Sequence, residues 1–302
     1  MLKTKIKDIE FNSPIIAASG TFGYGDEVEG FVDLSKIGAI VTKSITLEPR
    51  KGNPVPRIHE VEFGMINSIG LANVGVDKFC QDKIPLLNLI ETHFIVSVAG
   101  SRIEDYLKVI KEIENANGKH IAYEINISCP NTKQGGMEFG VDKDVTYKLI
   151  SQIKNITNKI VIVKLSPNVT NIENIAKSAE SAGADVISAT NTFVGLAIEY
   201  MSGKMLLSTK YGGVSGPAIK PLSLAKVHKI YNNIKIPIIG MGGIKSFKDV
   251  VEFIRVGSSM VQVGTLNYRD PAAFGKLYDD LEAFLIENQI SKLDDLKGNY
   301  FE

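Results

Sequence analysis

Residues 237–265 read PIIGMGGIKSFKDVVEFIRVGSSMVQVGT and contain two short apolar runs separated by an amphipathic stretch. The runs Pro237–Gly242 and Met260–Thr265 are typical of buried parallel strands. Phe247–Val256 between them has the spacing of a helix, and Ser246 can cap its first turn. This part of the chain therefore predicts one β-α-β unit of a parallel sheet.

The same alternation extends over the rest of the chain. Six further strands are expected, at Ile15–Ser19, Ala39–Ser44, Phe94–Ala99, Ala122–Ser128, Ile160–Ser166 and Asp185–Asn191. Further helices are expected at Ile103–Ala116, Asp142–Ile156, Asn171–Ala182 and Pro271–Glu287. Thr170 or Asn171 can cap the third of these helices, and Gly183 and Gly257 stand where helices should end.

Eight strands alternating with helices predict the α/β class and a (β/α)₈ TIM barrel. We expect a single domain over residues 1–302, with long insertions at about 45–93 and 192–236 and an N-terminal cover at Thr4–Phe11. The alternative is a doubly wound open sheet. Its dinucleotide fingerprint is missing after an early strand, because Gly23-Tyr24-Gly25 lacks the third glycine.

Composition limits the classes of function. The 302 residues include 34 lysines and arginines against 34 aspartates and glutamates, which argues against nucleic-acid or membrane partners held by net charge. Two cysteines are too few for a disulfide scaffold or for an iron–sulfur cluster bound by this chain alone. We see no metal-ligand cluster, no membrane-spanning run and no signal peptide, and therefore expect a cytoplasmic protein.

Every expected strand ends in a polar residue or a glycine, and active sites of such barrels lie at these ends. Gly242-Gly243 and Gly264-Thr265 follow the last two strands, where exposed backbone N–H groups often hold a phosphate. The other reading is that these glycines only make tight turns. A catalytic barrel that binds a phosphate group is the favoured interpretation.

Lys43 and Lys164 place positive charges near the ends of buried strands, where an unpaired ammonium is costly. Each is expected to meet an anion, either a ligand or a structural partner, and a Schiff-base lysine is a third possibility. Glu124 lies two residues before Asn126, faces the same way, and is expected to be a paired interior carboxylate.

Cys129 stands between Ser128 and Pro130, just after an expected strand, and is a candidate for chemistry at the barrel mouth. Cys80 lies in a helical stretch and is expected to be a small buried side chain. The amides of Asn67, Asn126 and Asn191 could hold a ring that bears amides and carbonyls.

Five motifs together resemble dihydroorotate dehydrogenase. They are Asn126-Ile-Ser-Cys-Pro-Asn131, Asn67-Ser-Ile-Gly-Leu71, Val163-Lys-Leu-Ser-Pro-Asn168, Ser215-Gly-Pro-Ala-Ile-Lys-Pro221 and Ile238-Ile-Gly-Met-Gly-Gly243. The resemblance implies a barrel with FMN at the C-terminal face of its strands. It also implies oxidation of (S)-dihydroorotate to orotate in de novo pyrimidine synthesis.

The resemblance implies a role for each matching residue. Cys129 would be the base that takes a proton from ring carbon 5, while hydride passes from ring carbon 6 to FMN. The substrate would be bound by Lys43, Asn67, Ser68, Ile69, Gly70, Leu71, Asn126, Asn191 and Thr192. FMN would be bound by Ser19, Lys43, Ser44, Ser97, Asn126, Lys164, Thr190, Gly216, Gly242, Gly243, Gly264 and Thr265.

Residues 18–25 and 212–217 resemble class 1B of the family. That class implies a homodimer within a heterotetramer, whose electron-transfer subunit carries FAD and a 2Fe–2S cluster and passes electrons to NAD. Ser97 is more typical of the fumarate-using class 1A, and Thr190 replaces a usual aliphatic residue. Class 1A, a tRNA dihydrouridine synthase, a Schiff-base aldolase and a non-catalytic binding barrel are the alternatives.

Overall fold

The computed structural model describes residues 1–27, 30, 32–128, 139–270 and 272–301, and it contains a closed barrel of eight parallel strands. In chain order these are β3 (Ile15–Ala17), β4 (Ala39–Val41), β7 (His93–Val98), β8 (Ala122–Asn126), β9 (Ile160–Lys164), β10 (Val186–Ala189), β13 (Ile238–Met241) and β14 (Met260–Val263). Every neighbouring pair is hydrogen-bonded in parallel, and β14 closes the barrel on β3. The predicted TIM barrel is confirmed, and the open doubly wound sheet is wrong.

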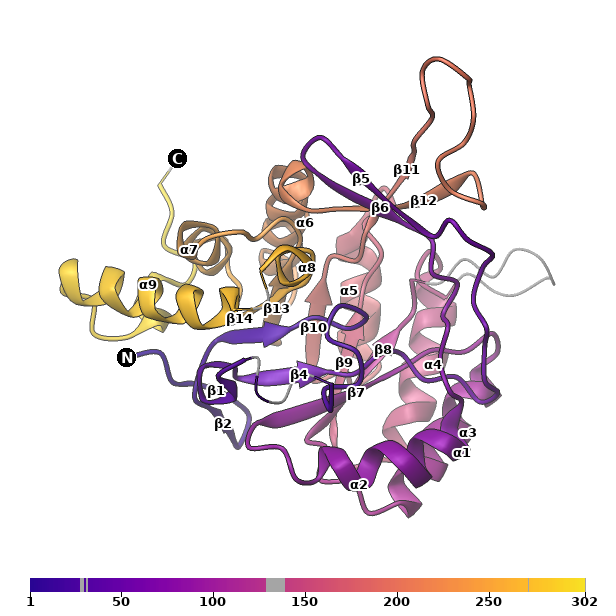
Figure 1. The fold of residues 1–302 in the computed structure, drawn as a ribbon. Coiled ribbons are helices and arrows are strands. Elements are labelled where there is room, and N and C mark those ends of the chain that lie inside the picture. Colours follow the sequence, from indigo (N-terminus) through magenta and orange to yellow (C-terminus); the bar gives the residue numbers. More distant parts are fainter. Residues whose placement is uncertain (28–29, 31, 129–138, 271, 302) are drawn as a thin grey trace.

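Helices surround the barrel (Figure 1). The longer ones are α3 (Ile103–Asn115), α4 (Lys143–Lys154), α5 (Ile172–Ser181), α6 (Lys220–Tyr231), α7 (Phe247–Arg255) and α9 (Ala273–Glu287). The shorter elements are α1 (Val76–Lys78), a π turn at Phe79–Lys83, α2 (Ile84–Leu87), α8 (Leu266–Arg269) and 3₁₀ turns at Leu34–Lys36, Pro217–Ile219 and Leu293–Leu296.

The helix caps agree in part with the sequence. Ser246 caps α7 in a reciprocal capping box with Asp249, as expected. Asn171 occupies the cap position of α5, but its side chain makes no capping hydrogen bond. The helix α6 was not predicted, because its buried face includes the polar Ser223 beside Val227 and Ile230 and so lacks a continuous apolar stripe.

The barrel interior changes from apolar to polar along several of the strands. The layers toward the N-terminal ends of the strands contain Ile16, Ile95, Ile162 and other side chains packed in one apolar cluster. Residues two positions further along the strands face the same interior, and several are polar: Ser97, Glu124, Lys164, Ser188 and Gln262. The polar layer lies just below the C-terminal ends of the strands, where barrel enzymes bind their ligands.

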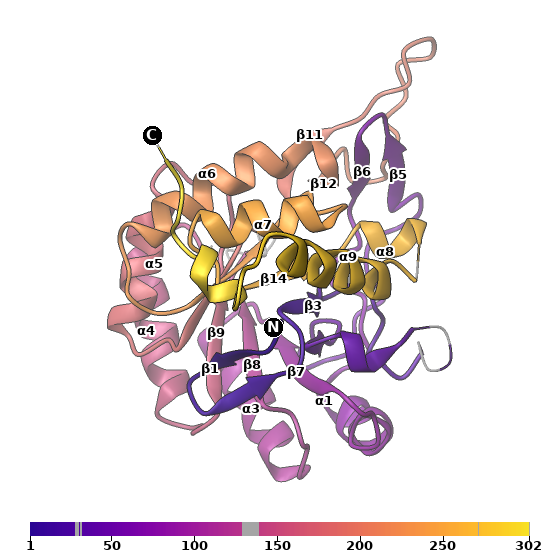
Figure 2. The same cartoon turned by 90° about the vertical axis from the view of Figure 1, so that its left-hand side faces the viewer.

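The two long insertions form one antiparallel sheet of their own. Its order is β11 (Phe193–Leu196), β12 (Tyr211–Ser215), β6 (Gly64–Asn67) and β5 (Ile58–Val61). In the β6–β12 pairing Gly213 is opposite Asn67, so segments far apart in the sequence meet here. The chain between β11 and β12 projects away from the barrel (Figures 1 and 2).

The expected N-terminal cover is a hairpin of β1 (Thr4–Ile6) and β2 (Ile9–Phe11). Ile6 and Phe11 are buried in the same cluster as the lower barrel side chains. The hairpin therefore closes the end of the barrel opposite the strand C termini.

His120, which precedes β8, makes stability depend on pH. It is 2% exposed, packs against Phe94 and Tyr123, and its pKa is lowered to about 3 by burial and then by the charge of Lys159. Below about pH 6.5 the unfolded chain therefore binds a proton here that the folded chain does not. The free energy of unfolding should fall by at most about 1.4 kcal/mol per pH unit as the pH drops from 6.5 toward 3.

Chemical denaturation from about pH 7.5 to about pH 5 measures this slope above the range in which carboxylates titrate. A His120→Leu variant replaces the imidazole with an apolar side chain of similar size that binds no proton, and it should flatten the slope. Equal slopes in the two proteins would contradict the assignment to His120.

Candidate active site

A cavity of about 520 Å³ opens at the C-terminal ends of the barrel strands, beneath the insertion sheet. Its walls contain most of the residues that the sequence assigned to substrate or cofactor. These are Ser19, Lys43, Ser44, Asn67, Ile69, Leu71, Asn126, Lys164, Thr190, Asn191, Thr192, Gly216, Gly242, Gly243, Gly264 and Thr265. The volume is in the range of small-molecule and cofactor sites.

Three of the assigned residues do not line the cavity. Ser68 Oγ accepts hydrogen bonds from Asn53 and Thr209, and a side chain at Gly70 would collide with Asn53. Ser97 is fully buried, with its Oγ 2.8 Å from Ser44 Oγ, so it reaches the cavity only through Ser44. Cys129 lies outside the described residues.

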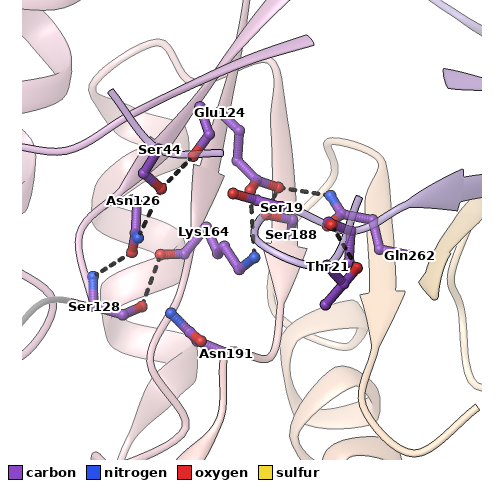
Figure 3. Close-up of polar contacts among 12 residues, drawn as sticks. Ser19, Thr21, Ser44, Glu124, Asn126, Ser128, Lys164, Ser188, Asn191 and Gln262 are labelled. Carbon is purple, nitrogen blue, oxygen red and sulfur yellow. Dashed lines mark hydrogen bonds and ion pairs between the residues drawn. The ribbon is translucent and has the colours of Figure 1, made fainter. Parts of the chain in front are cut away.

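Glu124 organises the polar floor of the cavity (Figure 3). Its carboxylate is fully buried and lies 3.4 Å from Lys164 Nζ. The second oxygen accepts hydrogen bonds from Ser188 Oγ at 3.1 Å and from Gln262 Nε2 at 2.6 Å. The expected interior ion pair of Glu124 is therefore present, and its partner is Lys164.

Lys43 is the second cation of the cavity. It is half-buried, and no described residue forms an ion pair with its ammonium group. Burial lowers its pKa, and the charges of Glu27 and Arg57 act in opposite directions on it. The anion that the sequence predicted for Lys43 is thus absent from the described part of the chain, which leaves the ammonium free for an anionic ligand.

Three amides line the cavity with part of their hydrogen-bonding capacity in use. Asn126 Oδ1 accepts a hydrogen bond from the Ser128 N–H, and Asn126 Nδ2 lies 3.4 Å from Ser44 Oγ. Asn191 Oδ1 accepts from the Thr192 N–H at 2.8 Å, and Asn67 Nδ2 donates to the Gly213 carbonyl at 3.2 Å. Among the described residues, Asn191 Nδ2 and Asn67 Oδ1 have no partner, so one donor and one acceptor remain for a ligand.

Four backbone N–H groups at the ends of β13 and β14 are also free. Those of Gly242, Gly243, Gly264 and Thr265 donate no hydrogen bond to another described residue, and all four residues line the cavity. Gly242 and Gly243 have φ of +120° and +85°, and a side chain at Gly242 would lie 2.2 Å from Ser223 Oγ. Converging free amides of this kind bind anions.

Gln262 and Ser188 are members of the floor that the sequence reading missed. Both are nearly fully buried polar residues in the middle of apolar strands. Gln262 lies two residues before Gly264, and Ser188 two residues before Thr190, so strand alternation was the signal that could have found them. Gln262 Oε1 is buried without a hydrogen-bond partner in the described structure, a situation that costs about 1–3 kcal/mol unless a ligand supplies a donor.

These features define a (β/α)₈ barrel whose cavity presents an ammonium group, side-chain amides and backbone N–H groups that are free among the described residues. No described helix has the length and apolar character needed to span a membrane, and no three described His, Cys, Asp or Glu residues gather as metal ligands.

Comparison with known proteins identifies the family. A family profile described as dihydroorotate dehydrogenase matches residues 1–285. The protein named dihydroorotate dehydrogenase B (NAD(+)), catalytic subunit, from Geotalea uraniireducens is 43% identical over 297 residues, covering 98% of this chain and 97% of the relative. Proteins of the same name from Desulforamulus reducens and Phocaeicola vulgatus are each 45% identical, again over 98% of this chain. The chain belongs to the dihydroorotate dehydrogenase family.

A solved structure supports the fold. The crystal structure of the Eimeria tenella dihydroorotate dehydrogenase in complex with ferulenol superposes with a TM-score of 0.78. It is 24% identical and covers 98% of this chain and 87% of its own. The predicted family and fold class are both confirmed.

Proposed function

We propose that this chain is the catalytic subunit of a class B, NAD-linked dihydroorotate dehydrogenase, which oxidises (S)-dihydroorotate to orotate in pyrimidine synthesis. The observation that carries the proposal is the cavity itself, where family motifs from distant parts of the chain meet. The relatives' names specify a catalytic subunit and NAD. The fumarate-using class and the Schiff-base aldolase are not favoured.

The cavity fits FMN. The free backbone N–H groups of Gly242, Gly243, Gly264 and Thr265 suit its phosphate. At the cavity floor, Gln262 Oε1 is buried without a partner and could accept a hydrogen bond from FMN. Lys164 is the cation at the floor, where it would stabilise negative charge on the reduced ring. Bound FMN would supply the hydride acceptor for the reaction.

The remaining groups suit the substrate. Lys43 would attract the substrate carboxylate, and the free atoms of Asn67 and Asn191 would bind its ring amides and carbonyls. We propose Cys129 as the base that takes the proton from ring carbon 5; the N–H of the preceding Ser128 donates to Asn126, which lines the cavity. The buried walls hold the ring in one orientation and exclude water.

The electrons must then leave this chain. We propose an electron-transfer partner subunit carrying FAD and a 2Fe–2S cluster, with two copies of each chain in a heterotetramer. The support is the name of the relatives, which are catalytic subunits of an NAD-linked enzyme. A cytoplasmic location goes with this proposal.

An absorbance spectrum of the purified chain tests the function. We expect a yellow protein whose flavin absorbance bleaches when dihydroorotate is added without oxygen, while NAD alone is not reduced until the partner is supplied. A yellow protein that does not bleach would reject this substrate. A colourless protein that takes up no added FMN would reject the cofactor and return the Schiff-base lysine to consideration.

Phosphate recognition gives a second prediction. Because the four free amides can make charge-assisted hydrogen bonds, the chain should bind FMN at least about 100-fold more tightly than riboflavin, which lacks the phosphate. Titrations that follow flavin fluorescence quenching measure both affinities. Affinities within a few fold of each other would show that these amides do not bind the phosphate.

A further inference from the structure

We propose that Gln262 accepts a hydrogen bond from a hydroxyl of the FMN ribityl chain, and that Glu124 is the positioning residue that orients Gln262 for it. The inference rests on the proposed function, because it takes FMN as the ligand. It concerns two buried residues that the sequence reading gave no role in binding.

The orientation of the Gln262 amide follows from its neighbour. An ionised carboxylate only accepts hydrogen bonds, so the group facing Glu124 Oε2 must be the Gln262 NH₂, which lies 2.6 Å away. Glu124 is itself held by Ser188 and Lys164. The Gln262 amide is therefore fixed with Oε1 turned away from Glu124.

That oxygen is an acceptor without a protein donor. Gln262 is 1% exposed and lines the cavity, yet Oε1 has no hydrogen-bond partner in the described structure. A buried acceptor normally has a donor, and a ligand bound in the cavity that Gln262 lines can supply one. FMN carries two kinds of donor that could serve, the ribityl hydroxyls and the imide N–H of its ring.

The position of Gln262 along β14 favours a hydroxyl. It lies two residues before Gly264, ~6.6 Å along the strand from the amides that suit the phosphate. The ribityl chain joins directly to the phosphate and so occupies this distance, whereas the imide edge of the ring lies at the far end of the molecule.

The test compares FMN with three analogues that each lack one secondary ribityl hydroxyl. The full-length chain, stripped of flavin, is titrated with each, first as wild type and then as Gln262→Met, which keeps the length of the side chain and removes the acceptor. We expect wild type to bind one analogue about fivefold more weakly than FMN. Gln262→Met should bind FMN itself about fivefold more weakly and treat that analogue like FMN.

Two further variants separate orientation from general packing. Glu124→Gln presents an amide in place of the carboxylate, so either end of the Gln262 amide can face it and the Gln262 amide can turn over. The ratio of the affinity for FMN to the affinity for the analogue should then shrink. Ser188→Ala removes one hydrogen bond that holds Glu124 but keeps its carboxylate, so the Gln262 NH₂ must still face it, and the preference for FMN over the analogue should persist.

The outcomes are distinguishable. Wild type that binds FMN and all three analogues equally well overturns the inference without any variant and leaves the proposed function standing. The inference is also overturned if Gln262→Met prefers FMN over the analogue by the same factor as wild type does. Wild type that binds no FMN overturns both the inference and the proposed cofactor.

Discussion

Replacement of Cys129 by alanine should leave FMN bound and slow flavin reduction by dihydroorotate by about 10²- to 10⁴-fold, the usual contribution of a positioned general base. A thiol has a pKa near 8.5 before any influence of its surroundings, so its thiolate, the form that takes up a proton, is accessible near neutral pH, whereas the alkoxide of a hydroxyl is not. Stopped-flow absorbance under anaerobic conditions measures the rate directly. FMN content after purification reports whether the site is intact.

Cys80 provides a matched control within the same chain. It lies in the π turn Phe79–Lys83, half-buried, and burial raises its pKa to about 11. Because this thiol is away from the cavity wall and stays protonated, dihydroorotate should reduce the flavin of the Cys80→Ala variant at the wild-type rate. Normal reduction in Cys129→Ala would remove Cys129 from the chemistry.

The barrel could be predicted from the sequence because its strands are buried on both faces and so appear as apolar runs. The run at Ile160–Lys164, for example, is buried at every position. The insertion sheet could not be found in this way. Its strands have one exposed face, as in Ile58–Val61, and contain the glycines of Tyr211–Ser215, so no apolar run marks them.

Much of the candidate site followed from strand ends and family motifs, but its floor did not. Gln262 and Ser188 are bordered by apolar neighbours in β14 and β10, and a reading of strand ends passes over them. Ser97 was assigned to FMN by the family resemblance, whereas the structure places it behind Ser44. Which polar residue faces a ligand and which supports a neighbour depends on contacts between strands far apart in the chain.

Lys164→Met should destabilise the protein by about 3–5 kcal/mol, because the fully buried Glu124 carboxylate loses its cation. The same change should lower the reduction potential of bound FMN, since the positive charge that stabilises the reduced, anionic ring is gone. Chemical denaturation measures the first effect. Equilibration with redox dyes of known potential measures the second.

The double variant Lys164→Met with Glu124→Gln separates the two effects. It removes both charges, so no uncompensated ion remains in the barrel interior, and most of the lost stability should return. The reduction potential should recover only in part, because glutamine removes the negative charge left near the flavin but does not replace the cation. A potential that returns fully to the wild-type value together with stability would mean that Lys164 supports the fold and does not act on the flavin. A potential that stays below the wild-type value while stability recovers would assign to Lys164 a direct electrostatic part in the reaction.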